Sequence, residues 1–227
     1  MSLRDRLSRR VVPRTLVALS TIRWPGKVTA AIRRALGGRG RIELFVAFDD
    51  PESAVALLGL AQRVAHRRVR LAVEPVVARG IPDDPATEDK RRYAIVDARR
   101  LARRAGLELS RGEPVTAQAT AFLASWAAAA PDAPRRVAFC VAAMRELWLS
   151  SDGPIHRKRF AGLWQEHVGG EPPADDGPGA RSAERRMRRR RLYDTPVAVV
   201  HGEWFFAHER LAQIEHRLDD LGWKAAA

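Results

Sequence analysis

A chain of 227 residues, 46% of them apolar, can bury the core of one large domain or two small ones. Arginine or polar residues interrupt its apolar runs before they reach the roughly 18 residues of a membrane-spanning helix, so we expect a soluble protein. The single cysteine, Cys140, excludes an intrachain disulfide, a CxxC dithiol and a cysteine-rich zinc cluster.

The net charge of +13 is concentrated in two segments. Residues 1–40 carry ten Lys and Arg against one acid, a charge of +9, and residues 181–191 carry seven Arg against one Glu, a charge of +6. The remaining residues are close to neutral, with a charge of −2. The overall charge therefore does not by itself predict a nucleic-acid-binding protein, and no helix-turn-helix, zinc-finger or RNA-recognition pattern occurs.

Residues 1–40 are predicted to form a basic N-terminal helical arm, broken at Pro13 and at Pro25–Gly26. The apolar stretch Thr15–Ile22 resembles part of a signal peptide. Arg23 follows it instead of a small-residue cleavage site, so we interpret the arm as retained. The apolar residues of the arm have amphipathic spacing, which fits packing on the domain, contact with a membrane surface or contact with a partner protein.

The segment Ile42–Phe48 is an almost continuous apolar run rich in β-forming residues, which is typical of a strand covered on both faces. Asp50 and Pro51 follow it, and they suit the N-cap and the first position of a helix that extends to about Ala65. Val69–Val77 is a second strand candidate. The order strand, helix, strand predicts two parallel strands joined by a crossover.

The chain then changes to helical periods over residues 82–191. Gly, Pro or Asp residues separate the successive helical segments. These segments are Lys90–Ala105, Thr116–Ala130, Arg135–Leu149, His156–Val168 and Ala180–Arg191. No strand signal of comparable strength occurs among them, so this part of the chain is predicted to be a large all-helical insertion.

Strand character returns at Pro196–His201, and Gly202 predicts a turn into a second short strand that ends near Phe206. A final helix is expected over Glu209–Leu221. With the N-terminal elements, this gives the order β-α-β…β-β-α interrupted by the helical insertion. We therefore predict an α/β thioredoxin-like fold over residues 41–227.

Four short motifs occur along the chain in a definite order. They are Phe48-Asp49-Asp50-Pro51-Glu52-Ser53-Ala54, Val73-Glu74-Pro75-Val76, Lys90-Arg91-Arg92-Tyr93 followed by Asp97, Arg99 and Arg100, and the C-terminal pair Asp194–Val200 and Phe205–Leu211. Their order and spacing resemble the DsbA-superfamily branch that contains 2-hydroxychromene-2-carboxylate isomerases and kappa-class glutathione transferases. The resemblance covers roughly residues 41–223, and its C-terminal pair is the most specific part.

This resemblance implies a cis peptide bond at Thr195–Pro196 and a glutathione site. In the family, the backbone beside the cis-proline pairs with the cysteinyl unit of glutathione, and an acid at the last helix holds the glutamyl end. The resemblance assigns these roles to Thr195 with Pro196 and to Glu209 with Arg210. The family serine that faces the glutathione sulfur corresponds to Asp50, and a carboxylate at that place disfavours a thiolate.

Asp50 has two interpretations. As the cap of the helix that Pro51 opens it is structural, and as a replacement for the family serine it could act as a general base, although the sequence supplies no matched acid. Ser53, one helical turn further on, is a second catalytic candidate. Cys140 has apolar neighbours and is expected to be a buried hydrophobic residue and not a reactive thiol.

The arginine run Arg181–Arg191 allows three interpretations. It is a solvated helix face, one wall of a pocket for an anionic ligand beside Pro196, or a nucleic-acid contact. The histidines His156, His201 and His208 lie in different contexts without a companion ligand, so no metal site is expected.

The sequence leaves two functions open. One is a glutathione-dependent isomerase or transferase, and the other is a non-catalytic thioredoxin-fold module for binding or scaffolding. A minor third interpretation is charge-driven binding of nucleic acid or an anionic membrane by residues 1–40. The expected partners are glutathione or another small-molecule substrate and a second copy of the chain in a homodimer, with no specific nucleic acid. A chain without disulfides suits a reducing compartment, so a cytoplasmic location is expected.

Overall fold

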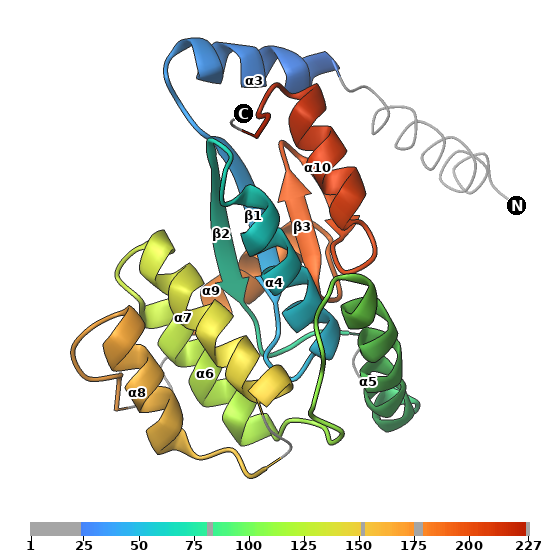
Figure 1. The fold of residues 1–227 in the computed structure, drawn as a ribbon, viewed down its shortest axis with the longest axis vertical. Helices are drawn as coiled ribbons and strands as arrows, with labels where there is room; N and C mark the ends of the chain where they lie inside the picture. Colours follow the sequence, from blue (N-terminus) through green and yellow to red (C-terminus); the bar gives the residue numbers. More distant parts are fainter. Residues whose placement is uncertain (1–23, 81–83, 151–152, 175–178, 226–227) are drawn as a thin grey trace, which may run out of the picture.

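The computed structural model describes residues 24–80, 84–150, 153–174 and 179–225 (Figure 1). Its helices are α3 (Trp24–Ala35), α4 (Pro51–Val64), α5 (Thr87–Arg104), α6 (Ala117–Ala129), α7 (Ala133–Arg145), α8 (Arg157–His167), α9 (Gly179–Arg189) and α10 (Leu211–Asp220). Its strands are β1 (Gly40–Val46), β2 (Val69–Pro75), β3 (Val197–Val200) and β4 (Glu203–Phe206). A π-helical turn, Glu146–Ser150, follows α7 directly.

The four strands form one mixed sheet with the order β2-β1-β3-β4. β1 and β2 are parallel, from Gly40 opposite Val69 to Val46 opposite Pro75. β1 and β3 are antiparallel, and so are β3 and β4. The predicted strand-helix-strand unit and the predicted C-terminal hairpin are therefore confirmed, with element ends that differ by a few residues.

Helices cover both faces of this sheet (Figure 1). α4 and α10 lie on one face, where Leu44 belongs to the main core. Gly59 on α4 permits their close approach, because a Cβ at this position would lie only 2.7 Å from Leu211 Cδ1. α9 lies on the other face, where Met187 packs in a smaller core with Phe45. The sheet is thus buried on both sides, as the continuous apolar run of β1 predicts.

Between β2 and β3 the described residues form helices but no strand, as predicted for the insertion. Five aromatic rings on α6, α7 and α8 pack edge to face or tilted, and they are Phe122, Trp126, Phe139, Phe160 and Trp164. Trp148, in the π-helical turn, is fully buried, and its Nε1 donates to the Phe48 carbonyl at 3.1 Å. The insertion is therefore bonded to the segment that follows β1.

α3 is the described part of the predicted arm, and it packs on the domain. Ala30 is fully buried, the Arg34 guanidinium donates to the Leu221 carbonyl, and the same group lies 5.7 Å from the centroid of the Trp223 ring. Pro25 and Gly26, where the break in the arm is predicted, lie at the start of the described part of α3. Residues 1–23 lie outside the described residues. None of the described helices is long and apolar enough to cross a membrane.

Candidate functional site

Asp50 caps the N-terminus of α4, as the sequence predicts. Its Oδ1 accepts a hydrogen bond from the Glu52 N–H at 3.1 Å, and Pro51 occupies the first helical position. Its Oδ2 accepts hydrogen bonds from the hydroxyls of Ser53 at 2.5 Å and Thr195 at 2.9 Å. The contact between Asp50 and Thr195 joins the start of α4 to the loop before β3.

These contacts enclose the Asp50 carboxyl, and the residue is 1% exposed. Burial raises the pKa of Asp50, and the charge of Arg79 and the hydrogen bonds from Ser53 and Thr195 oppose this increase. Ser53 is fully buried, and its hydroxyl also accepts a hydrogen bond from the Ala47 N–H at 3.2 Å. Both predicted catalytic residues are therefore held by contacts within the fold.

The loop before β3 carries the residues that the resemblance assigns to ligand binding. The Thr195–Pro196 peptide bond is cis. The Thr195 N–H donates to Asp194 Oδ1 at 2.9 Å, and the Pro196 carbonyl accepts from the Ala207 N–H at 2.9 Å. The Thr195 N–H is therefore already bonded to a neighbouring carboxylate, which a ligand would have to displace.

Arg79, in the loop after β2, lies among the acids of this region. Its Nε lies 3.4 Å from Asp49 Oδ1, and its Nη1 lies 3.3 Å from Asp194 Oδ1. Burial acts to lower the pKa of Arg79, but the carboxylates of Asp50, Asp49 and Asp194 outweigh burial and raise the pKa above its ordinary value. Arg79 stays charged and links the loops that follow β1 and β2 to the loop before β3.

A cavity of about 700 Å³ opens beside Asp50 and Thr195, and we call it the α4 cavity. Its volume is in the range of small-molecule sites. Its wall carries six acids and three bases, which are Asp49, Asp50, Glu52, Asp84, Asp89 and Asp194, with Arg79, Lys90 and Arg91. Tyr93 and Tyr193 also line it, and both are exposed. Three of the four sequence motifs therefore meet at this cavity, which can take a ligand that carries charges of both signs.

Glu52 and His208 form a pair at this site that the sequence analysis missed. Glu52 lines the α4 cavity, and its Oε2 lies 3.5 Å from His208 Nε2. Burial and then the charges of Asp50 and Asp97 raise the pKa of Glu52 to about 8, and burial lowers the pKa of His208. Near neutral pH the pair is therefore not an ion pair but a protonated carboxyl beside a neutral imidazole. The two groups can exchange a proton.

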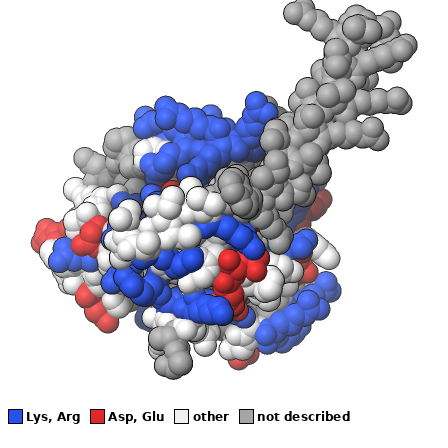
Figure 2. Space-filling view, turned by 90° about the horizontal axis from the view of Figure 1, so that it is seen from above, with Lys and Arg blue, Asp and Glu red and all other residues white. Residues whose placement is uncertain are grey.

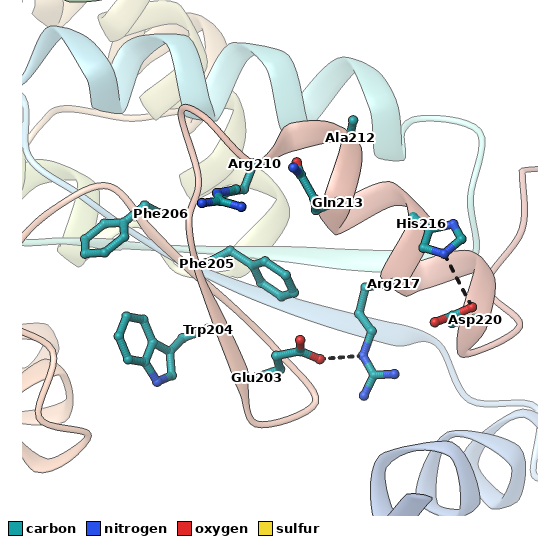
Figure 3. Close-up of a pocket in the computed structure, with 10 residues that line it drawn as sticks. All are labelled: Glu203, Trp204, Phe205, Phe206, Arg210, Ala212, Gln213, His216, Arg217 and Asp220. Atoms are coloured by element: carbon teal, nitrogen blue, oxygen red, sulfur yellow. Dashed lines mark ion pairs between the residues drawn. The ribbon is translucent and has the colours of Figure 1, made fainter. Parts of the chain in front are cut away.

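Glu209 and Arg210 lie outside the α4 cavity. α10 begins at Leu211, two residues later than predicted, because a turn closed by the hydrogen bond from the Arg210 N–H to the Ala207 carbonyl precedes it. Glu209 is exposed in this turn. Arg210 lines a separate pocket of about 640 Å³ between β4 and α10, beside Phe205 (Figure 3). The structure thus brings Asp50, Ser53 and Thr195 together, but not Glu209 and Arg210.

The arginine run 181–191 also contributes no residue to the wall of the α4 cavity. The run therefore forms no part of the α4 cavity, and Arg190 at its end lines a different cavity instead. α9 lies on the face of the sheet opposite to α4 and α10, where Arg186 pairs with Glu74. The predicted helix Ala180–Arg191 has an amphipathic pattern, but this pattern alone does not indicate which sheet face the helix covers.

Cys140 is fully buried, as predicted, and burial raises the pKa of its thiol to about 12. It is therefore protonated at neutral pH and inaccessible as a nucleophile. Within the described ranges, no group of three or more His, Cys, Asp or Glu side chains is arranged to hold a metal ion.

Comparison with solved structures identifies the fold. The chain resembles 2-hydroxychromene-2-carboxylate isomerase at 16% identity and a TM-score of 0.61, over 80% of this chain and 96% of that one. It resembles a probable DsbA oxidoreductase from Streptomyces coelicolor at 16% identity and a TM-score of 0.60, over 83% and 93%. Proteus mirabilis ScsC matches at 12% identity and a TM-score of 0.52, over 97% and 94%.

No protein-family model and no curated protein matches the chain. The chain has the DsbA-like thioredoxin fold, and at these identities the likeness shows the fold alone.

Proposed function

We propose that this DsbA-like thioredoxin-fold protein binds a small zwitterionic molecule of the glutathione class in the α4 cavity, without dithiol redox chemistry. The proposal rests on the 2.9 Å hydrogen bond between Thr195 Oγ1 and Asp50 Oδ2, because this contact brings the prolyl loop and the start of α4 into one wall of the cavity. The single, buried Cys140 supplies no dithiol.

The accessible charges of the cavity suit a ligand that has both carboxylate and ammonium groups. The side chains of Lys90 and Arg91 are 66% and 43% exposed, so they can reach a ligand carboxylate. Asp194 is 38% exposed and can accept hydrogen bonds from an ammonium group. Asp50 is buried and has both oxygens bonded, so it offers no stabilisation to a ligand thiolate.

Titration calorimetry with glutathione tests this proposal. We expect saturable heat at millimolar ligand or below, and an affinity for S-methylglutathione within about twofold, because no thiolate is used. Asp194→Asn should weaken binding about threefold to fivefold, since a partly exposed charge contact contributes up to about 1 kcal/mol. The matched control is Asp132→Asn, at the cap of α7, where asparagine caps as well as aspartate. Absence of saturable heat, or equal effects of the two substitutions, would contradict the proposal.

The Glu52–His208 pair favours a second candidate, a glutathione-dependent isomerase or transferase. A general acid works best when its pKa is near the working pH, and Glu52 meets this condition at the wall of the cavity. An isomerisation returns every proton that it borrows. Glu52 lines the cavity and can give and take this proton, and His208, which is not part of the cavity wall, can exchange a proton with Glu52.

Turnover of 2-hydroxychromene-2-carboxylate in the presence of glutathione separates the two candidates. For an enzyme, Glu52→Gln should lower kcat about a hundredfold, since general acid–base catalysis contributes about a hundredfold or more. Glu88→Gln, on the exposed side of α5, should leave kcat unchanged. If the unmodified protein shows no turnover, or if Glu52→Gln retains it, the enzymatic candidate is wrong.

A further inference from the structure

A second cavity, of about 490 Å³, lies near the start of β1 and shares no residue with the α4 cavity. We call it the basic cavity. Three arginines line it, which are Arg33 of α3, Arg41 of β1 and Arg190 just after α9. Glu43 is the one acidic residue in its wall. The cavity therefore carries more positive than negative charge.

Glu43 neutralises only part of this charge. Its Oε1 lies 2.8 Å from Arg41 Nη2, and its Oε2 pairs with Arg190. Arg33 makes no ion pair with any described residue. Two arginines that share one carboxylate and a third without an acidic partner leave several N–H donors for an anionic group.

The two basic segments of the sequence meet at this cavity. Arg33 belongs to residues 1–40 and Arg190 to residues 181–191, the two segments that carry the net charge of the chain. Figure 2 looks onto the end of the domain that carries α3, where basic side chains form a large group with few acidic side chains beside it. The fold thus brings together charge that is far apart in the sequence.

An aromatic surface lies in the same wall. Trp204, on the edge strand β4, is 52% exposed and lines the basic cavity. Its ring packs edge to face against Phe206, with centroids 5.9 Å apart and planes at 84°, which restrains its orientation. The buried side chains of Val199 and Leu192 also line the cavity. A fixed, half-exposed indole beside arginines can stack on a planar ring.

The pKa of His201 responds to the positive charge around the basic cavity. It lies in the turn between β3 and β4, with a φ of 48°, and it lines the basic cavity. Burial and then the charges of Arg33 and Arg217 lower its pKa. An anion bound here would oppose the effect of these arginines and would raise the pKa of His201.

We propose that the basic cavity binds a phosphate group attached to a planar ring, as in a free nucleotide. The phosphate contacts Arg33, Arg41 and Arg190, and the ring stacks on Trp204. The volume of about 490 Å³ suits one nucleotide and not a strand. This site is independent of the function proposed for the α4 cavity.

Calorimetry with adenosine 5′-monophosphate, inorganic phosphate and adenosine tests this proposal on the full chain. We expect the nucleotide to bind most tightly, with an affinity that falls as salt rises. Arg33→Gln and Trp204→Ala should each weaken nucleotide binding about tenfold. Arg185→Gln is the matched control, because Arg185 is exposed on α9 and does not line the cavity. The pKa of His201, followed by NMR, should rise when the nucleotide binds.

Several outcomes would overturn this proposal. Phosphate that binds as tightly as the nucleotide would remove the role of the ring. Equal losses in Arg33→Gln and Arg185→Gln would indicate general attraction to a basic protein. A single-stranded oligonucleotide that binds far more tightly than the nucleotide, and loses this affinity in Trp204→Ala, would identify a strand and not a free nucleotide as the ligand.

Discussion

At pH 8, Glu52→Gln should increase the free energy of unfolding by about 3 kcal/mol. The pKa of Glu52 is raised from 4.5 to about 8 in the folded protein, because the carboxyl is buried and lies near Asp50 and Asp97. The folded state therefore keeps a proton that the unfolded chain releases. The contribution of Glu52 to the free energy of unfolding is complete below pH 4.5, and it is lost as the pH rises through 8.

The pH dependence of stability determines the direction of this effect and the pH range in which it appears. Between pH 5 and 8, Glu52 alone should lower the stability of the unmodified protein by about 1.4 kcal/mol per pH unit. Glutamine cannot ionise, so the variant lacks this slope and retains only the slope from other groups, such as Asp50. Part of the gain in the free energy of unfolding is offset, because glutamine changes the contact between residue 52 and His208. At pH 5 the two proteins should differ by less than about 1 kcal/mol.

Urea denaturation at several pH values measures this effect. Glu171→Gln, at an exposed position, is the control and should follow the unmodified protein at every pH. If Glu52→Gln shows the same slope as the unmodified protein between pH 5 and 8, Glu52 ionises normally in the fold. The proposed role of Glu52 as a protonated acid at the α4 cavity would then be wrong.

Local sequence patterns determined much of this fold. The cap at Asp50, followed by Pro51, fixes the start of α4 because both effects act within one helical turn. The apolar run of β1 predicts a strand that is covered on both faces, and α4 and α9 provide that cover. Three of the four motifs quoted for the family resemblance also meet in space, at the α4 cavity.

Contacts between distant residues account for what the sequence could not predict. Glu52 and His208 are separated by most of the chain, and their contact depends on how the turn before α10 packs against the first turn of α4. The bond from Thr195 to Asp50 spans 145 positions. The place of Arg190 in the basic cavity depends on which sheet face α9 covers, and an amphipathic pattern fits either face.

Trp148→Ala should lower the free energy of unfolding by about 4 kcal/mol, because removal of a large buried aromatic side chain costs about 3–5 kcal/mol. Trp148 is fully buried, and its Nε1 donates to the Phe48 carbonyl at 3.1 Å. Trp148→Phe keeps most of the ring but leaves this carbonyl unpaired, so it should cost about 1.5 kcal/mol beyond the lost volume. Trp204→Ala, at a half-exposed ring, is the control and should cost less than about 1 kcal/mol.

The same bond connects the insertion to the candidate site. Phe48 lies two residues before Asp50, so the hydrogen bond from Trp148 holds the segment that positions the α4 cap. Trp148→Phe should therefore speed amide hydrogen exchange at Glu52, whose N–H donates to Asp50, more than exchange in β3. A uniform change across the protein would show that Trp148 supports only the global fold. A local change would show that the helical insertion holds the α4 cavity in shape.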